Sequence, residues 1–301
     1  MQFSKKFNSN QKKLNMLVFP KAKINLGLNI VGKRSDGFHN IESVFYNINW
    51  QDALEVVEIR GTEETEGIKE TNGILGTKGE GIEIVNSGID INSPLKENLI
   101  FKAFNLLKNR VKLPPLKVYL HKNIPMGAGL GGGSSDAASF LKLTNKKFEL
   151  KLSENDLKEI ASQIGSDCAY FIENKPAFAT QKGEILEPIN LDLSKYYILL
   201  VYPNMNSNTK EAYEGVIPKK PIKSVKEIVL NEPLGNWKNI LFNDFEKTIF
   251  KKYPEIENIK NTLYKNGAIY SAMSGSGSAV FGIFNEKPVI EFPKNYLVYF
   301  S

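Results

Sequence analysis

The sequence has few of the side chains that build disulfide bonds and metal sites. Its 301 residues include one cysteine, Cys168, and two histidines, His39 and His121. A single cysteine excludes an internal disulfide, and these three side chains cannot assemble a typical zinc site. Low cysteine usage fits a reducing compartment, so we expect a cytoplasmic protein.

Long apolar runs and basic surface stripes are also missing. The longest apolar run, residues 196–202, has the length of a strand and is too short to span a membrane. Residues 1–15 contain four lysines and no acid, and we expect them to form a disordered basic tail. The other 35 of the 39 basic residues are balanced by 33 acidic ones, so the rest of the chain is nearly neutral. We therefore expect no nucleic acid and no membrane among its partners.

The overall composition is that of a globular protein. Hydrophobic residues make up 42% and charged residues 24% of the chain, which is long enough to bury a sizeable core. Patterns typical of strands and of helices are mixed along the chain, which favours an α+β fold. We predict an N-terminal domain over residues 16–165 and a C-terminal domain over residues 166–301.

Residues 21–30 alternate between polar and apolar side chains, which is the period of a half-buried strand. The polar face of this strand carries Lys23 and Asn25, two positions apart and on the same side. An ordinary solvated strand lysine is the plain structural interpretation of Lys23.

Five glycines fall within seven positions of “PMGAGLGGGSSDAASFL”, residues 125–141. Clustered glycines leave backbone N–H groups free to converge on an anion. A helix is predicted to follow at once, and the positive end of its dipole favours a phosphate. Ser134 or Ser135 can cap this helix, and we expect Asp136 to point outward from its first turn.

Three known loop types and a plain turn compete as interpretations of this stretch. The absence of lysine between residues 123 and 141 excludes a P-loop. Gly127, Gly129 and Gly132 match a dinucleotide fingerprint formally, but they lie mid-chain rather than in an opening βαβ unit. The downstream motifs of protein kinases are missing. A flexible turn that merely joins a strand to a helix rarely needs five glycines.

Several segments resemble, in the right order, the motifs of one family. “PMGAGLGGGSSDAA” resembles the second motif of the GHMP kinases, named for galactose, homoserine, mevalonate and phosphomevalonate, and residues 20–45 resemble the first. “IGSDCAYFI”, “AFATQKGEIL” and “SGSGSAVFGIF” resemble later motifs. The resemblance implies a two-domain α+β fold, with a left-handed βαβ crossover in the N-terminal domain and a ferredoxin-like C-terminal domain.

The resemblance also implies an activity, the ATP-dependent phosphorylation of a small-molecule hydroxyl. The match is best to members that act on a cytidyl compound, which implies the 2-hydroxyl of 4-diphosphocytidyl-2-C-methyl-D-erythritol, in the non-mevalonate isoprenoid pathway. Two alternatives stay open: another acceptor, mevalonate or homoserine, and a catalytically silent nucleotide-binding protein. We expect ATP and Mg2+ as cofactors, and a monomer or a homodimer.

Two residues match catalytic positions of the family. Asp167 matches the aspartate of a G-x-D motif, and would act on the hydroxyl as a base or as an orienting group. Its structural alternative is a helix N-cap. Lys23 matches the strand lysine of the family and would pair with that carboxylate, while Asn25 would help to position both.

The glycine-rich segment would hold the ATP phosphates, and a serine hydroxyl would be one ligand of Mg2+, with Ser135 preferred over Ser134. The residues predicted to contact the nucleotide are Pro125, Met126, Gly127, Ala128, Gly129, Leu130, Gly131, Gly132, Gly133, Ser134 and Ser135.

Phe38 and His39 stand where the family usually has a Tyr-His pair, and would contact the cytidine ring by stacking and by edge hydrogen bonds. Phenylalanine keeps the stacking surface but lacks the tyrosine hydroxyl. The structural alternative is that Phe38 packs in a hairpin and His39 caps a turn.

Overall fold

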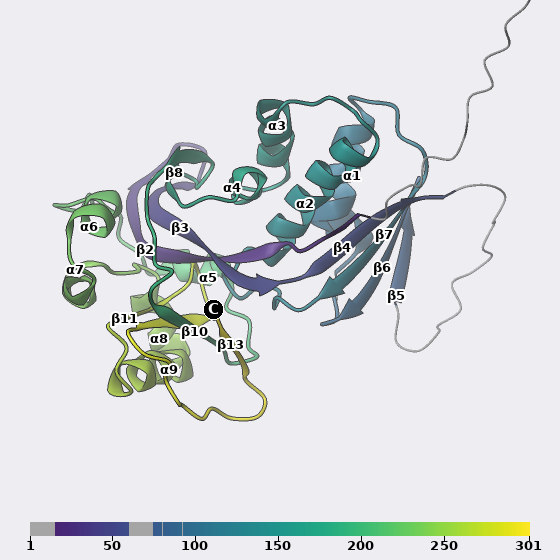
Figure 1. Ribbon diagram of the computed structural model, residues 1–301. Coiled ribbons are helices and arrows are strands. Elements are labelled where there is room, and N and C mark those ends of the chain that lie inside the picture. Colours follow the sequence, from purple (N-terminus) through teal and green to yellow (C-terminus); the bar gives the residue numbers. More distant parts are fainter. Residues whose placement is uncertain (1–15, 60–74, 80, 92) are drawn as a thin grey trace, which may run out of the picture.

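The computed structural model describes residues 16–59, 75–79, 81–91 and 93–301, so the predicted tail of residues 1–15 lies outside the described part. The described strands form three sheets, with helices packed around them (Figure 1). None of the described helices is both long enough and apolar enough to cross a membrane.

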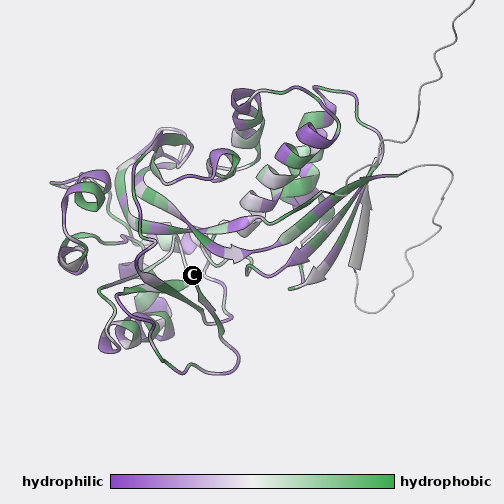
Figure 2. Cartoon of the chain, viewed as in Figure 1, coloured by the Kyte–Doolittle hydropathy of each residue, from purple (hydrophilic) through white to green (hydrophobic). Residues whose placement is uncertain are grey.

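The first sheet has the strand order β1-β4-β7-β6-β5. Its strands are β1 (Leu17–Val18), β4 (Ala53–Glu58), β5 (Leu75–Gly79), β6 (Ile82–Gly88) and β7 (Leu116–Lys122). The parallel strands β6 and β7 are joined through the short 3-10 helix η1 (Leu95–Glu97) and helix α1 (Leu99–Lys108), which makes a βαβ unit. Hydrophobic and hydrophilic residues alternate along β4 and β7 (Figure 2), so one face of this sheet is suited to packing.

Helices cover that apolar face. They are α1 and α2 (Gly132–Lys147), while α3 (Glu154–Ile164) packs against both of these helices and α4 (Cys168–Glu173) packs against α2 and α3. Helices and strands share one hydrophobic cluster, in which Val118, Phe104 and Phe140 are at most 1% exposed. Each such side chain contributes roughly 1.5–3 kcal/mol by leaving water. Within this layer, α2 packs against β4.

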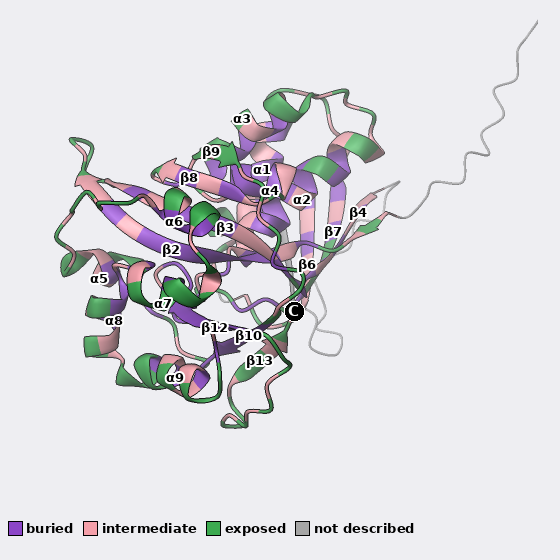
Figure 3. Cartoon of the chain, turned by 60° about the vertical axis from the view of Figure 1, so that its left-hand side comes forward, coloured by how far each residue is buried: buried purple, intermediate pink, exposed green. Residues whose placement is uncertain are grey.

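The second sheet is antiparallel, with the order β2-β3-β8-β9. Its strands are β2 (Lys21–Lys33), β3 (His39–Gln51), β8 (Ala177–Gln181) and β9 (Ile185–Pro188). Residues 21–30 form a strand as predicted, but it is not half-buried, because Lys23 and Asn25 of its polar face are only 3% and 2% exposed. Figure 3 shows most of β2 as buried. The glycine-rich segment packs on Lys23 of the polar face, and Ile24 and Leu26 of the apolar face lie in a hydrophobic cluster, so both faces of β2 are covered.

The third sheet has the order β11-β12-β10-β13, and all its neighbouring strands are antiparallel. Its strands are β10 (Tyr197–Tyr202), β11 (Tyr270–Met273), β12 (Val280–Phe284) and β13 (Leu297–Phe300). The helices of this part are α5 (Thr209–Glu214), α6 (Val225–Asn231), η2 (Leu234–Asn236), α7 (Trp237–Ile240), α8 (Glu246–Lys252) and α9 (Pro254–Lys265). Numbered by their order in the chain, these strands lie in the sheet as second, third, first and fourth, which is the predicted ferredoxin-like order. Helix α9 packs on β11 and β12.

The second and third sheets share a core. One hydrophobic cluster contains Ile24 and Leu26 of β2 together with Leu200 and Phe281 of the third sheet. Strands β8 and β9 pair with β3, although they follow the predicted domain boundary in the sequence. The division between residues 165 and 166 stays a prediction.

The turn at residues 274–279 docks onto the glycine-rich segment. The N–H of Ala279 donates to the carbonyl of Ala128 at 3.1 Å, and the Ser274 hydroxyl donates to the carbonyl of Gly129 at 2.8 Å. Gly129 has a φ of +77°, and a β-carbon there would collide with the Ser274 carbonyl oxygen. This contact joins residues 145 positions apart in the sequence.

We expect Gly129→Ala to lower the free energy of unfolding by about 3 kcal/mol or more, because a collision with a backbone oxygen adds to the strain of a positive φ. Gly267→Ala is the matched control, since Gly267 has a φ of +91° and no atom lies within 4 Å of an added β-carbon. That control should cost about 1 kcal/mol. Urea denaturation measures both, and equal losses would contradict a tight contact at Gly129.

Candidate active site

The glycine loop, residues 125–131, leads from β7 into α2. Gly127, Gly129 and Gly131 have φ values of +67°, +77° and +70°, a region that favours glycine. The carbonyls of Ala128, Gly129 and Leu130 all accept hydrogen bonds from β2 or from the turn at residues 274–279. In a trans peptide the N–H points opposite to the carbonyl, so the next three N–H groups point away from those partners. Such a series of N–H groups is suited to binding an anion.

The helix after the loop begins without a side-chain cap. Gly131 occupies the N-cap position in the left-handed conformation, and α2 starts at Gly132. The prediction that Ser134 or Ser135 caps α2 is therefore wrong, since both serines lie inside its first turn. Ser135 is 2% exposed and contributes to the lining of a cavity of about 500 Å³, together with Phe171 of α4.

Lys23 and Asp167 meet beside the loop. The Lys23 Nζ atom lies 3.3 Å from Asp167 Oδ2, and their side chains are 4% and 30% exposed. The same ammonium donates to Asn25 Oδ1 at 2.5 Å and lies 4.6 Å from the centre of the Phe45 ring. A β-carbon at Gly131 would lie 3.3 Å from Lys23 Cγ, so the loop packs directly on the lysine. Lys23 is therefore not a solvated strand lysine.

Asp167 occupies the N-cap position of α4, but its side chain makes no capping hydrogen bond. Its Oδ2 atom faces Lys23. A β-carbon at Gly183, in the turn between β8 and β9, would lie 3.7 Å from Asp167 Oδ1. The absent side chain at Gly183 thus leaves space in front of the carboxylate oxygen that Lys23 does not pair.

Asn25 connects this pair to the rest of β2 and to the C-terminal part of the chain. Its Nδ2 group donates to the Ser43 hydroxyl at 2.9 Å, and Ser43 in turn donates to the Gly27 carbonyl at 2.6 Å. Its backbone N–H donates to Ser274 Oγ at 3.3 Å. Ser274 opens the segment “SGSGSAVFGIF” that resembles a family motif, whereas Ser43 was not found, because a serine in a strand carries no periodic signal.

Phe38 and His39 lie at the end of the β2–β3 hairpin and have separate partners. His39 stacks on Tyr213 of α5, with ring centres 4.7 Å apart and an angle of 17° between the rings. Phe38 is 59% exposed, and the Lys182 ammonium lies 5.1 Å from its ring centre. Lys182 precedes Gly183, so the turn that borders Asp167 also borders Phe38.

Tyr213 is a residue that sequence reasoning missed. Burial raises the pKa of its phenol, and the charge of Asp167 adds to this rise. The ring also contacts Phe245 edge-on, with ring centres 4.8 Å apart. Tyr213 lies in a short helix of six residues, and nothing in the local sequence distinguishes it from other aromatic residues.

Cys168, next to Asp167, is a packing residue. Burial raises the pKa of its thiol to about 12, and the neighbouring charge of Asp167 also raises it, against a hydrogen bond with Ser134. A thiol in this state is not a nucleophile at neutral pH. His121 is exposed and hydrogen-bonds Ser87 at 3.0 Å, outside the site.

Asp136 does not point outward, and that prediction is wrong. Its carboxylate is 2% exposed and pairs with the Lys122 ammonium at 2.9 Å, and Lys122 also pairs with Asp52. Burial raises the pKa of Asp136 to about 7, with Lys122 opposing and Asp52 reinforcing the rise. For Lys122, the two carboxylates outweigh burial and raise the pKa above its ordinary value. The sequence did hold one indication of this pair: Lys122 follows the alternation of β7 at a position that faces the core, where a lysine needs an acidic partner.

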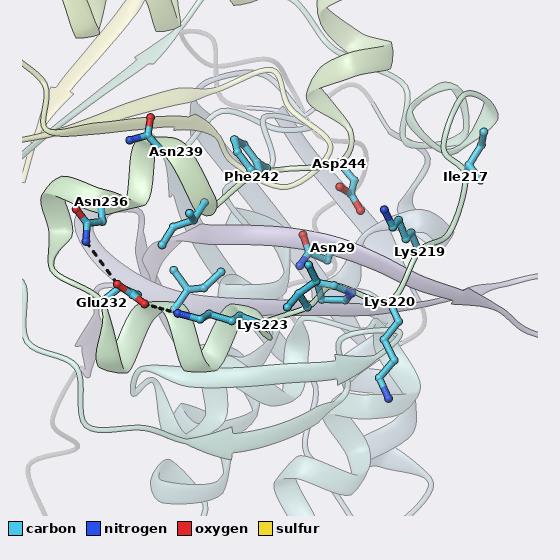
Figure 4. A pocket seen from close by; sticks show the side chains of 14 residues that line it. Asn29, Ile217, Lys219, Lys220, Lys223, Glu232, Asn236, Asn239, Phe242 and Asp244 are labelled. Carbon is cyan, nitrogen blue, oxygen red and sulfur yellow. Dashed lines mark hydrogen bonds and ion pairs between the residues drawn. The ribbon is translucent and has the colours of Figure 1, made fainter.

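A cavity of about 750 Å³ lies beside β2, between α6, α7 and residues 217–223 (Figure 4). Two of its lining residues, Lys223 and Glu232, form an ion pair at 2.6 Å. Lys23, Asp167 and the glycine loop do not line it, so this cavity is separate from the candidate active site.

Two family models match the chain. The GHMP kinases N terminal domain matches residues 98–175, which include the glycine loop, and the GHMP kinases C terminal model matches residues 225–294. The second match covers the turn that docks on the loop.

Curated relatives match along most of the chain. A protein of Bacteroides fragilis is 48% identical over 91% of this chain and 94% of its own length, and one of Parabacteroides distasonis is 49% identical over 91% and 93%. Both are named 4-diphosphocytidyl-2-C-methyl-D-erythritol kinase.

Solved structures agree with this match. A crystal structure of 4-(cytidine 5'-diphospho)-2C-methyl-D-erythritol kinase is 27% identical, with a TM-score of 0.70 over 89% of this chain and 90% of that one. A homoserine kinase from Cytophaga hutchinsonii, at 15% identity, has the same fold with a TM-score of 0.66 over 98% and 96%. The identities of the curated relatives, over nine-tenths of the chain, confirm the expected family: the chain belongs to the GHMP kinases.

Proposed function

We propose that this protein transfers the γ-phosphoryl group of ATP to the 2-hydroxyl of 4-diphosphocytidyl-2-C-methyl-D-erythritol, in the non-mevalonate isoprenoid pathway. The observation that carries the proposal is the ion pair between buried Lys23 and partly exposed Asp167, beside the glycine loop. GHMP kinases use ATP as their phosphate donor. The names of the curated relatives support the choice of acceptor.

The glycine loop would hold the phosphates. The N–H groups of Gly129, Leu130 and Gly131 are the donors that the carbonyl hydrogen bonds turn outward, and the N-terminus of α2 adds a favourable dipole. Phosphoryl transfer requires mainly positioning and charge stabilisation, which fixed backbone donors supply without reorganisation. Residues 125–135 as a whole remain our proposed nucleotide-contacting segment.

Asp167 would act on the acceptor hydroxyl. Its Oδ2 atom is held by Lys23, so Oδ1 is the atom that would accept the hydroxyl proton or orient the hydroxyl for attack. Lys23 is itself held by Asn25 and by the face of Phe45, which fixes the direction of the carboxylate. Base and orienting group are both compatible with this arrangement.

In our proposal, a metal ion binds together with the nucleotide. The described residues contain no group of three or more acidic, histidine or cysteine side chains that could hold an ion alone. Mg2+ often takes most of its ligands from phosphates and water, with one or two from the protein. We propose the Ser135 hydroxyl as a protein ligand. The ion would neutralise negative charge on the phosphates.

The cytidine group would bind at the aromatic surface formed by Phe38, His39 and Tyr213. An exposed ring at Phe38 offers a stacking face, and an imidazole can donate and accept at the edge of a base. The turn at Lys182 and Gly183 joins this surface to Asp167, so a cytidyl compound bound there can present a hydroxyl to the carboxylate.

The proposal predicts which acceptor supports ADP release. With ATP and Mg2+, we expect ADP release with 4-diphosphocytidyl-2-C-methyl-D-erythritol and only background rates with mevalonate and homoserine. The cytidyl compound is the one of the three that carries a nucleobase able to stack on the aromatic surface. A coupled pyruvate kinase assay measures all three. ADP release with mevalonate or homoserine instead would show that the protein is a GHMP kinase with a different acceptor. ATP binding without release for any acceptor would favour a catalytically silent protein.

Asp167→Asn should lower kcat by roughly two to four orders of magnitude, because a neutral amide cannot take the proton and holds Lys23 weakly. ATP affinity should stay within about threefold, since the carboxylate pairs with Lys23 and has no role in holding the phosphates in our proposal. Asp192→Asn, in a surface turn, is the matched control and should leave kcat unchanged. Steady-state kinetics with calorimetric ATP binding test this, and near-normal turnover of Asp167→Asn would overturn the assigned role.

A further inference from the structure

We propose that Lys122, Asp52 and Asp136 form a buried positioning triad that fixes both ends of the glycine loop in its phosphate-binding geometry. The inference rests on the proposed function, in which this loop binds the phosphates of ATP. The triad acts through the loop and does not touch the nucleotide.

The first anchor lies at the start of the loop. Asp52 stands between β3 and β4, and its Oδ1 atom accepts from the N–H of Asn123 at 2.6 Å and of Ile124 at 2.8 Å. These are the last residues before the loop. The backbone N–H of Asp52 is held in turn by the Pro20 carbonyl at 2.9 Å, so the anchor is fixed to the chain that leads into β2.

The second anchor lies at the end of the loop. Asp136 is the fifth residue of α2, and its Oδ2 atom pairs with Lys122 Nζ at 2.9 Å. The same ammonium pairs with Asp52 Oδ2. A β-carbon at Gly132 would lie only 3.0 Å from Lys122 Nζ, so the ammonium lies directly behind the start of α2. One cation thus joins the residues on either side of the loop.

Burial excludes a direct role in binding phosphate. Lys122, Asp52 and Asp136 are 0%, 1% and 2% exposed. Two carboxylates share one ammonium. Removing the Asp136 carboxylate leaves Lys122 paired with Asp52, but it removes the oxygen that ties this ammonium to α2. The end of the loop then loses its link to the residues at the start of the loop.

The test compares two substitutions of Asp136 with a destabilised control. Asp136→Ala removes the bridge, whereas Asp136→Asn keeps an oxygen that can accept from Lys122. Leu116→Ala is the control, because Leu116 is fully buried at the opposite end of β7 from the loop. Calorimetry measures the affinity for the Mg2+ complex of β,γ-imido-ATP, at a temperature where circular dichroism shows every variant folded.

We expect Asp136→Ala to bind the analogue at least roughly tenfold more weakly, and Asp136→Asn to stay within about threefold of the unmodified protein. Leu116→Ala should bind normally despite its lower stability. Normal binding by Asp136→Ala, or an equal loss in Leu116→Ala, would overturn the inference. If Asp136→Ala does not fold, Asp136→Ser replaces it and the same outcomes apply.

The unmodified protein separates this inference from the proposed function. Failure of the unmodified protein to bind the analogue would overturn both proposals. Binding by the unmodified protein and equally by Asp136→Ala would overturn only the positioning triad.

Discussion

The ion pair between Lys23 and Asp167 is the interaction on which the architecture of the site depends. A buried ammonium is unfavourable by several kcal/mol unless it is paired and hydrogen-bonded. Lys23 meets this requirement with three partners: the Asp167 carboxylate, the Asn25 amide oxygen and the face of Phe45. Asp167 remains 30% exposed, so the pair has one closed side and one side open to an acceptor.

The site also depends on distant parts of the chain meeting at the glycine loop. The loop carbonyls are held by the N–H of Lys23, by the Ser274 hydroxyl and by the N–H of Ala279. Asn243 in turn holds the carbonyls of Met273 and Gly275, each at 2.8 Å. Both family-model regions therefore contribute to one loop conformation, which explains why the shared core between the second and third sheets matters for function.

Local sequence patterns predicted much of this arrangement. Alternation located β2, clustered glycines located the loop, and the residues that match the family motifs proved to be neighbours at the site. The α+β fold and the ferredoxin-like strand order followed from the family resemblance. Each of these features is local or is carried by a contiguous motif.

What the sequence did not reveal depends on contacts between distant segments. Asp136 resembled an ordinary first-turn acid because its partner, Lys122, approaches from another element. The polar face of β2 seemed solvated because the loop and the turn that cover it lie far away in the sequence. Tyr213 was missed because its stack on His39 bridges 174 positions, and no periodicity records such a contact.

The central claim is that Lys23 and Asp167 act as one unit, and a double-mutant cycle on kcat tests it most directly. Lys23→Met, Asp167→Asn and the double variant are compared with the unmodified protein under saturating ATP and cytidyl acceptor. The account predicts strong non-additivity, with the double variant about as slow as the slower single variant, as expected for residues that work together. Rate losses that multiply would show that the two side chains act independently, and would contradict the account.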